Sequence, residues 1–364
     1  MRAEGVRIAL QLAATAWAVA IVARWHRLDR VVAAPRTRSL AIVIPTFNEA
    51  DKIGALVDRL RAQLRPEDEL VVADNSTDPT AVAAAAAGAT VVSTGAPAPG
   101  WVGKTWNCAH GAYATTNDLL VFLDADVEPD PTFLDKLVAL HELSPTALLT
   151  VAPYHRVARP YELLSAAPNL VSVLAVGRRS PTVFGPCVAL SRVQYHAIGG
   201  HDAVADSIVD DLALGRRAQQ LNIAIRRFLG GTTLRYRMYP TGFGSLLEGW
   251  TKNLCLGAKS TWRPAVLAAV GWVCSVFDTT RSALSDPTAS SVTTLAVVMA
   301  AAGWMFSRIG NFGLAAGLLV SPLAVVFVAL FTGSFVLTTA LRKVRWKGRW
   351  LDVGPERTPR SSPT

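Results

Sequence analysis

Two stretches of the sequence combine residue types that are typical of chemistry on phosphate groups. The stretch 98-APGWVGKTWN-107 fits a relaxed phosphate-binding loop, in which a small residue and four others precede Gly103, Lys104 and Thr105. Downstream, 119-LLVFLDAD-126 looks like the acidic strand end that usually accompanies such a loop. The first hypothesis is therefore a P-loop nucleoside triphosphatase.

Two features of this loop argue against that hypothesis. Pro97 and Pro99 lack the backbone N–H groups with which a P-loop cradles phosphates. Asp124 follows Thr105 by 19 residues, which leaves room for one helix and one strand. P-loop folds usually place more chain between the two motifs, so the match is interpreted as accidental.

The acidic pair 124-DAD-126 supports a different chemistry. Two carboxylates two residues apart, at the end of a buried strand, can approach one divalent cation that is bound to a diphosphate. Oxygen ligands from aspartate suit Mg²⁺ or Mn²⁺. A lone DxD is weak evidence, but the apolar run before it makes a strand end the preferred interpretation.

Strand and helix patterns alternate around these motifs. The alternation favours an α/β domain with a mostly parallel sheet, whose ligands bind at the C-terminal strand edge. Apolar runs predict strands at 40–45, 69–74, 89–93 and 118–124, and helical periodicity predicts helices at 50–64, 81–88 and 105–116.

The composition points to a membrane. Hydrophobic residues make up 51% of the 364 residues and charged residues 17%, which is too apolar for an ordinary soluble enzyme. The net charge of +9 fits positively charged flanks of membrane helices. Nucleic-acid binding is disfavoured, because Lys and Arg border apolar stretches and do not alternate with aromatics. The four cysteines form no close pair, so neither a zinc site nor a disulfide framework is indicated.

Charge placement sets the expected topology. Residues 1–25 are interpreted as an uncleaved anchor, because the charges follow the apolar run instead of preceding it. The globular domain is expected over 39–260. A C-terminal membrane region covers 264–341: 264–277 is short or interfacial, and 289–306 and 312–341 are long enough to span, unless 312–341 forms a hairpin at Pro322. The basic tail 342–364 is expected in the cytoplasm, with 354–364 disordered.

Three motifs in order resemble family 2 glycosyltransferases: 41-AIVIPTFNEADKI-53, 70-LVVADNSTDPT-80 and 119-LLVFLDADVEPDPTFL-134. The resemblance covers roughly residues 39–260. It implies a GT-A fold, that is, a Rossmann-like α/β catalytic domain with a mostly parallel sheet, here with N- and C-terminal transmembrane helices. It also implies a nucleotide-sugar donor and a divalent metal.

Further motifs are most similar to a membrane-bound subgroup that acts on carotenoid acids, with hopanoid-associated relatives: 100-GWVGKTWNCAHGA-112, 185-GPCVALSR-192, 236-YRMYPTGFGSLLEGWTKN-253 and 346-WKGR-349. The basic tail could fold back towards the diphosphate or lie on anionic headgroups. A lipophilic acceptor at the plasma membrane follows as the expectation, with the catalytic domain in the cytoplasm.

On the donor side, the resemblance places Pro45, Asn48 and Glu49 at the end of the first strand, with Glu49 on the nucleoside. Asp74 would bind the base, usually uracil, and Lys104 would lie near the base or the diphosphate. Simpler roles remain open: Asn48 could cap the next helix, Asp74 could be a turn residue, and Lys104 could be a solvated loop lysine.

The resemblance also assigns the reacting centre. Asp124 would touch ribose or sugar, and with Asp126 it would serve the metal. The pair Asp210-Asp211 matches the family's acidic pair, so Asp211 is the candidate general base of a single, inverting displacement. Alternatively, both would simply favour a helix N-terminus. His201 could meet the sugar or lie on the surface.

One region departs from the family. Processive members carry Gln-x-x-Arg-Trp on an interfacial helix, whereas this chain reads 248-EGWTKNL-254. Trp250 and Lys252 could stack on the acceptor and touch the diphosphate, or Trp250 could anchor the chain at the membrane surface. Single sugar transfer is therefore favoured over processive polysaccharide synthesis. A non-catalytic membrane scaffold is the alternative of another class, and the retained acidic residues argue against it.

Overall fold

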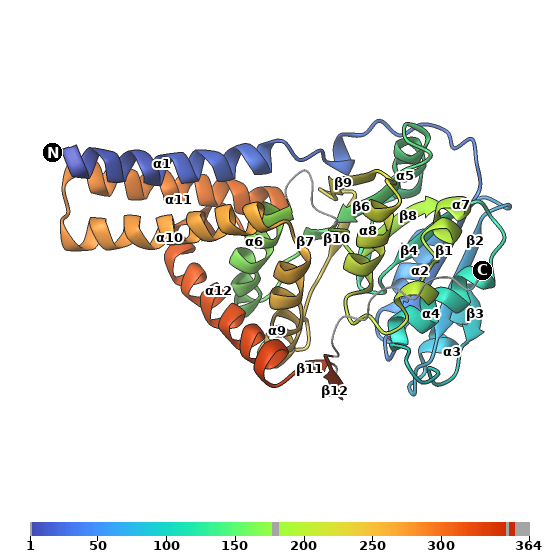
Figure 1. Cartoon of the computed structure of the whole chain (residues 1–364). Coiled ribbons are helices and arrows are strands. Elements are labelled where there is room, and N and C mark those ends of the chain that lie inside the picture. The colour runs from blue at the N-terminus through green and yellow to red at the C-terminus, as the bar shows by residue number, and fades with distance from the viewer. Residues whose placement is uncertain (1, 177–181, 347–348, 354–364) are drawn as a thin grey trace. The chain divides into compact units, whose positions relative to one another are not determined.

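The computed structural model describes residues 2–176, 182–346 and 349–353. The chain forms two compact units (Figure 1). The sheet unit comprises His26–Tyr154 and Pro181–Tyr236, and the helical unit comprises Met1–Trp25, His155–Ser180 and Arg237–Gly354. Residues 155–176 and 237–260, which sequence patterns place in the globular domain, thus cluster with the helical unit. The end of the tail, 354–364, lies outside the described residues.

The sheet unit is built on a seven-stranded sheet of order β3-β2-β1-β4-β8-β6-β9. Every neighbouring pair is parallel except the two that involve β8, so the expected mostly parallel α/β sheet is confirmed. The strands are β1 (Leu40–Thr46), β2 (Glu69–Asp74), β3 (Thr90–Ser93), β4 (Leu119–Leu123), β6 (Leu148–Ala152), β8 (Cys187–Ser191) and β9 (Ile225–Leu229). Smaller strands are β5 (Val127–Pro129), β7 (Tyr154–His155) and β10 (Leu234–Tyr236).

Burial explains why the central strands read as unbroken apolar runs. Every residue of β4 is buried, as is all of β1 except Pro45, because helices cover both faces of a parallel sheet. On α4, Gly111 lets the helix approach the sheet closely, since a Cβ there would lie 2.3 Å from Val43 Cγ1. The helices of this unit are α2 (Ile53–Arg61), α3 (Thr80–Ala86), α4 (Gly103–Tyr113), α5 (Phe133–Glu142), α7 (Arg192–Ala197) and α8 (Asp210–Gln220).

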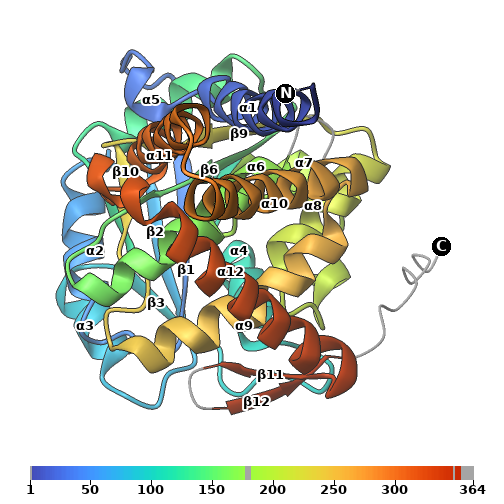
Figure 2. The same cartoon turned by 90° about the vertical axis from the view of Figure 1, so that its left-hand side faces the viewer.

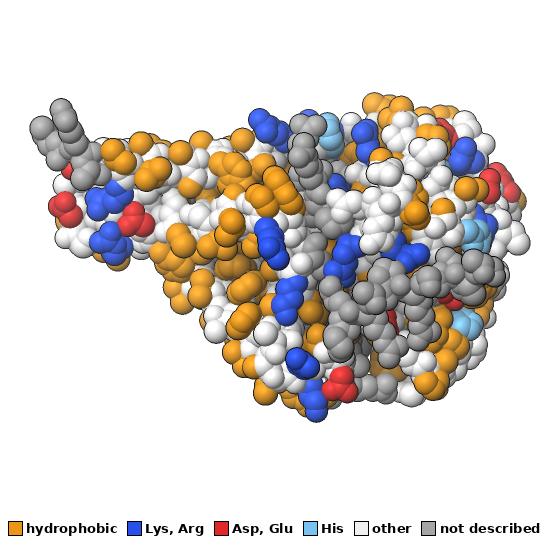
Figure 3. All heavy atoms as spheres, viewed as in Figure 1, with side chains coloured by type: hydrophobic (Ala, Val, Ile, Leu, Met, Phe, Trp, Pro, Cys, Tyr) orange, Lys and Arg blue, Asp and Glu red, His pale blue; other side chains and the backbone are white. Residues whose placement is uncertain are grey.

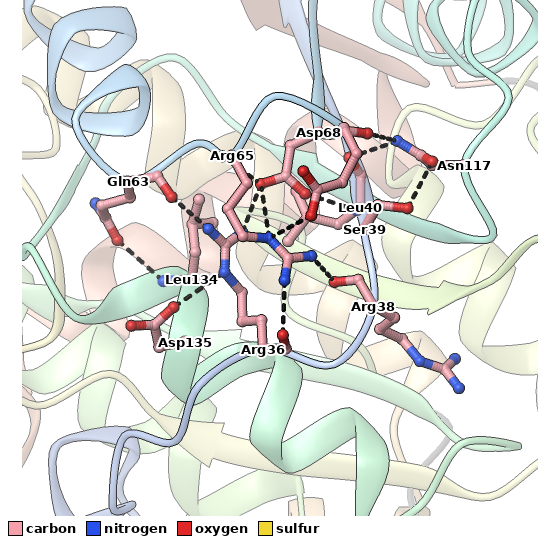
Figure 4. Close-up of polar contacts among 11 residues, drawn as sticks. Arg36, Arg38, Ser39, Leu40, Gln63, Arg65, Asp68, Asn117, Leu134 and Asp135 are labelled. Carbon is pink, nitrogen blue, oxygen red and sulfur yellow. Dashed lines mark hydrogen bonds and ion pairs between the residues drawn. The ribbon is translucent and has the colours of Figure 1, made fainter.

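A buried ionic network holds the start of β1 (Figure 4). The Asp68 carboxylate accepts hydrogen bonds from Arg36 Nη1 (2.8 Å), from the backbone N–H of Arg65 (2.8 Å) and from that of Leu40 (3.1 Å). Arg65 in turn donates to the carbonyl oxygens of Arg36 and Arg38. The segment that leads into the first strand is thereby tied to the loop that leads into the second.

The helical unit contains long apolar helices. Within the described residues, three are long and apolar enough to cross a membrane: Glu4–Ala23, Ala289–Ile309 and Leu314–Ala340. The space-filling view shows hydrophobic side chains over much of their outer face (Figure 3). The elements are α1 (Arg2–Ala23), α6 (Ala166–Val176), α9 (Phe243–Ser260), α10 (Arg263–Ser285), α11 (Ala289–Ile309), α12 (Val320–Phe335), β11 (Lys343–Trp346) and β12 (Arg349–Asp352).

Within this unit, α1, α10 and α11 lie side by side, whereas α12 runs obliquely to them in both views (Figures 1 and 2). The segment 264–277 is not a short element. Helix α10 continues for eight residues beyond it, through Asp278 and Arg281, to Ser285.

Candidate active site

The C-terminal ends of β1, β2 and β4 meet at one edge of the sheet, because these strands are parallel neighbours. Thr46 and Asp74 pair in register at the ends of β1 and β2, and Asp124 follows directly after β4. A pocket at this edge is lined by Pro45, Lys104, Cys108, Phe122, Leu123, Asp124, Gly185, Val188, His201, Asp210 and Leu214. Most of the residues singled out by sequence patterns therefore lie around one pocket or at the same edge of the sheet.

Asn48 connects the loops that follow β1 and β2. Its backbone adopts a left-handed conformation with φ of 56°, which asparagine tolerates better than most residues. Its side-chain oxygen accepts a hydrogen bond from the backbone N–H of Thr77 (2.9 Å), and its own N–H donates to Ser76 Oγ (2.7 Å). The residue at the N-cap of α2 is Lys52, so Asn48 holds the loop after β2 instead of capping the helix.

Asp74 and Glu49 flank this loop pair. Asp74 is buried, and its Oδ1 accepts a hydrogen bond from Thr46 Oγ1 at 2.7 Å. Glu49 forms an ion pair with Lys52 at 3.0 Å. Pro45, the last residue but one of β1, lines the pocket itself. The arrangement fixes the carboxylate of Asp74 beside the strand end.

Lys104 stands between two acidic groups. Its Nζ lies 2.8 Å from Asp124 Oδ1 and 3.8 Å from Asp210 Oδ1. Burial works against the charged amine, but the carboxylates of Asp124, Asp210 and Asp211 outweigh it and raise the pKa of Lys104 well above its ordinary value. Lys104 therefore stays protonated, in the first turn of α4, as an ion-paired residue of the site.

Asp126 carries a buried oxygen that needs a partner. Its Oδ1 has no hydrogen-bond partner among the described residues, although the atom is shielded from solvent. Burial, and then the neighbouring charge of Asp124, raise the pKa of Asp126 above its usual range. A buried carboxylate oxygen with no donor to satisfy it is costly to keep, so this position favours binding of a cation.

The second acidic pair opens helix α8. Asp211 Oδ2 accepts a hydrogen bond from the backbone N–H of Gly185 (2.8 Å), and its Oδ1 accepts one from that of Leu212 (2.9 Å). Burial, and then the charge of Asp210, raise the pKa of Asp211. A Cβ at position 185 would lie 2.9 Å from Asp211 Oδ2, so the glycine is needed for this approach.

His201 is a buried residue of the site, and the expectation that it could lie on the surface is wrong. It is 1% exposed, and burial lowers its pKa to about 3, so the ring is neutral. Tyr195 links to it twice: the hydroxyl lies 3.0 Å from His201 Nδ1 and accepts the backbone N–H of His201 at 3.1 Å. The other ring nitrogen, Nε2, lies 3.9 Å from Asp210 Oδ2.

One local feature of the sequence indicates that His201 is buried. Gly199 and Gly200 precede it with φ of 79° and 55°, a left-handed pair that turns the chain inward. Two glycines before a histidine therefore mark a turn into the core here.

The chain is similar to known proteins over most of its length. Residues 41–187 match the model of Glycosyl transferase family 2. A 4,4'-diaponeurosporenoate glycosyltransferase from Staphylococcus aureus (strain MRSA252) is 32% identical over 356 residues, which cover 92% of this chain and 93% of that protein. This chain is a family 2 glycosyltransferase.

A second curated relative and a solved structure are also similar to this glycosyltransferase. A 4,4'-diaponeurosporenoate glycosyltransferase from Staphylococcus haemolyticus is 30% identical over 335 residues, 87% of this chain and 89% of that protein. Among solved structures, a mannosyltransferase from Pyrobaculum calidifontis in complex with GDP-Man and Mn²⁺ is 19% identical, with a TM-score of 0.49, covering 88% of this chain and 98% of that chain.

The donor set of the glycosyltransferase fits a divalent cation. Asp124 and Asp126 present carboxylate oxygens, and the buried Oδ1 of Asp126 is unsatisfied among the described residues. Mg²⁺ and Mn²⁺ prefer such ligands. The part of the chain that the structure describes contains no group of three or more His, Cys, Asp or Glu that could hold a metal.

Trp250 and Lys252 of the glycosyltransferase lie on α9 in the helical unit, whereas the other candidates lie in the sheet unit. The Trp250 ring is 5% exposed, its indole N–H donates to Ser165 Oγ at 3.0 Å, and it packs edge-on against Tyr239. A ring with these contacts packs inside its own unit, so it does not present itself as a membrane-surface anchor.

Proposed function

We propose that this glycosyltransferase moves a single sugar from a nucleotide-sugar, with UDP as the expected nucleotide, to a lipophilic acceptor. The observation that carries the proposal is the pair of acidic groups on either side of Lys104, with Asp124 on one side and Asp210 on the other. Asp126 extends the first group and Asp211 the second. Such a site has one part suited to a metal-bound diphosphate and another suited to an acceptor.

The chemistry is a direct displacement at the anomeric carbon. An acceptor oxygen attacks that carbon from the face opposite the diphosphate, the bond from carbon to the phosphate oxygen breaks, and the nucleoside diphosphate leaves. One displacement of this kind inverts the configuration. Mg²⁺ or Mn²⁺, held by Asp124 and Asp126, would neutralise charge on the leaving group. Lys104, which stays protonated, adds a second positive charge beside it.

Asp211 is the candidate base on the acceptor side. The two backbone N–H groups that its oxygens accept orient its carboxylate. The raised pKa of Asp211 increases its ability to take a proton from an acceptor hydroxyl. A carboxylate acceptor is already ionised at neutral pH and needs no base. With such an acceptor, Asp211 would contribute mainly through the position of its charge.

The acceptor class follows from two observations. The relatives are named for glycosyl transfer to 4,4'-diaponeurosporenoate, a carotenoid acid. The chain also carries helices that are apolar enough to span a bilayer, so a long apolar acceptor could be met at the membrane that holds it. A carotenoid or other terpenoid acid, or another membrane lipid, is therefore the proposed acceptor. The absence of Gln-x-x-Arg-Trp from 248-EGWTKNL-254 favours single transfer over processive synthesis.

The test is transfer by the purified enzyme in detergent. Radiolabelled UDP- and GDP-sugars are each incubated with a carotenoid acid or with membrane lipid extract, in Mn²⁺ or in EDTA. Lipid-soluble product from a UDP-sugar that disappears in EDTA is the expected result. Failure of every donor to label any lipid, or product that is indifferent to EDTA, would count against the proposal.

Two variants separate catalysis from folding. Asp126→Asn removes the charge of the unsatisfied carboxylate, and we expect product formation to fall by about 10²-fold or more. Asp118→Asn is the matched control, because Asp118 is exposed and precedes β4 at the opposite end of the same strand. Wild-type product formation by Asp126→Asn would remove this carboxylate from the mechanism, whereas full biological activity of a variant that forms no product would support a non-catalytic scaffold.

A further inference from the structure

The C-terminal membrane region contains a helical hairpin that sequence patterns do not show. Helices α10 and α11 have 23 and 21 residues and are joined by residues 286–288. At 1.5 Å per residue each is about 31–35 Å long, which matches a hydrocarbon core of about 30 Å. Helix α10 is less apolar than the three candidate spans because it contains Asp278 and Arg281.

Contacts within the helical unit fix the direction of this hairpin relative to α1. Ser290 Oγ donates to Glu4 Oε1 (3.0 Å), and Gln11 Nε2 donates to Asp278 Oδ2 (2.7 Å). Ser275 Oγ donates to the carbonyl oxygen of Gln11. The turn 286–288 therefore lies at the N-terminal end of α1, and the start of α10 lies towards the C-terminal end of α1 (Figure 1).

This direction decides which helices cross the bilayer. If α1 crosses, its two ends face opposite sides, and the turn at its N-terminal end lies on the side away from Arg24. Helix α10 begins at Arg263 on the side of Arg24 and crosses to this turn, and α11 crosses back and ends at Ile309. The chain therefore crosses the bilayer twice between Arg263 and Ile309. An interfacial α10 would leave the turn on the side of Arg24, where Ser290 could not reach Glu4.

The charges in α10 are accommodated by this packing. Asp278 receives hydrogen bonds from Gln11 and from Arg281 (2.8 Å), so its carboxylate is paired on both sides. Both charged residues lie within about two turns of the helix end at Ser285, where side chains can extend to the headgroups. Mean hydropathy does not identify α10 as a membrane span, because it takes no account of the hydrogen bonds that Asp278 receives.

The segment after α11 turns back along it. Leu314 lies against Gly303, and Gly317 lies against Met299 and Gly303, where added Cβ atoms would meet backbone atoms at 2.2–2.6 Å. Later positions in this segment thus meet earlier positions in α11, so residues 314–317 run antiparallel to that helix. Close glycine contacts of this type are characteristic of packed membrane segments.

After Val320 the chain runs back along α12 towards the start of α10. Ser321 Oγ lies 2.6 Å from Thr280 Oγ1 in the second half of α10. Further on, Ser334 Oγ accepts the backbone N–H of Cys255, and Thr339 Oγ1 accepts from Lys259, both on α9 and shortly before α10 begins. The chain therefore reverses its direction near Val320, at the start of α12. Pro322 lies in the first turn of this helix, where its missing N–H is tolerated.

We propose that α1, α10 and α11 cross the bilayer and that residues 310–341 form a re-entrant hairpin with its apex near Val320. The loop at 310–313 and the basic strand β11 then share the side of Arg24, and the turn 286–288 faces the other side. Exposed apolar side chains, including Leu267, Val297 and Val325, would contact lipid. Sequence patterns alone favour 289–306 and 312–341 as the crossing pair, which puts residue 311 opposite β11.

Single added cysteines in the full chain distinguish the two topologies in cells. Ser285→Cys, Asn311→Cys and Lys343→Cys are each probed with a membrane-impermeant maleimide before and after permeabilisation, because all three positions are exposed. The parent chain, in which Cys108, Cys187 and Cys255 are buried and Cys274 lies within α10, measures background labelling. We expect Ser285→Cys to label in intact cells, and the other two only after permeabilisation.

Three results would overturn the proposal. They are labelling of Asn311→Cys on the side opposite to Lys343→Cys, labelling of Ser285→Cys on the same side as Asn311→Cys, and labelling of Lys343→Cys in intact cells. None of these readouts involves sugar transfer, so the topology can fail while the proposed reaction holds, and the reverse.

Discussion

Lys104 Nζ lies 2.8 Å from Asp124 Oδ1, which joins the first turn of α4 to the end of β4. This contact explains why the stretch 98-APGWVGKTWN-107 looks like a P-loop. The lysine does follow a glycine-containing loop and does face an acidic strand end. In this glycosyltransferase the lysine also lies near a second carboxylate, because Asp210 Oδ1 is 3.8 Å from its Nζ.

The first prediction concerns this lysine. Lys104→Met removes the positive charge between the two acidic groups, and we expect kcat to fall by about 10²-fold because charge on the departing diphosphate loses a partner. Lys136→Met is the control, since Lys136 donates to the hydroxyl of Thr233 and does not line the pocket. Steady-state transfer assays measure both. Wild-type kcat in Lys104→Met would remove the lysine from the mechanism.

The second prediction concerns the coupling of Tyr195 and His201. The phenol hydroxyl accepts the backbone N–H of His201 and lies within hydrogen-bond distance of His201 Nδ1, all in the buried core. Tyr195→Phe leaves these groups unsatisfied, so we expect a loss of about 1–3 kcal/mol in the free energy of unfolding. Chemical denaturation in detergent measures it.

A double-mutant cycle tests whether the pair acts as a unit. Because His201→Phe already removes one partner of the hydroxyl, the cost of Tyr195→Phe in that background should be smaller by about 0.5 kcal/mol or more. Strictly additive costs would show that the two residues stabilise the site independently. Transfer assays on the same variants show whether the pair, through the 3.9 Å approach of Nε2 to Asp210, also affects kcat.

The third prediction concerns pH. His141 on α5 is buried, and burial, followed by the charge of Arg38, lowers its pKa to about 4. As the pH falls, His141 is protonated near pH 6.5 in the unfolded chain but only near pH 4 in the folded chain. The contribution of neutral His141 to the free energy of unfolding is therefore fully present above pH 6.5 and is lost as the pH falls towards about 4. The loss is about 1.4 kcal/mol per unit across that window.

His141→Phe tests this assignment with little change of volume. Neither ring nitrogen of His141 has a hydrogen-bond partner among the described residues, so the substitution removes no hydrogen bond of the ring within them. Its unfolding free energy should match that of the parent at pH 8 and exceed it at pH 5. An equal difference at the two pH values would mean that His141 does not titrate on unfolding.

Local sequence patterns predict the first strands of the sheet well. The runs 40–45 and 69–74 gave β1 and β2 to within one residue, because strands buried on both faces must be continuously apolar. The positions of Asn48, Asp74 and Asp124 at the strand ends follow directly from that result. Register between parallel neighbours then brings the ends together without any further information.

Features that depend on distant partners were not visible in the sequence. Trp250 is buried because Ser165, which is 85 residues away in the chain, accepts its indole N–H. The apolar run of α10 ends in the sequence at 277, whereas the helix continues, since Gln11 of α1 binds Asp278. In each case a polar group that reads as a surface signal is paired across the fold.

The fourth prediction concerns the network at the start of β1. The Arg36 and Asp68 side chains form an ion pair at 2.8 Å and are 3% and 0% exposed. Asp68→Ala leaves the buried Arg36 guanidinium with only its ion pair to Asp135 (3.0 Å), and it also removes the acceptor for the N–H groups of Arg65 and Leu40. We expect a loss of about 3–5 kcal/mol in unfolding free energy.

Glu67→Ala is the control: that side chain is 52% exposed in its pair with Arg65, so its loss should cost about 1 kcal/mol or less. Denaturation of both variants at one pH decides the matter, since equal and small costs would show that the buried pair contributes no more than a surface pair does.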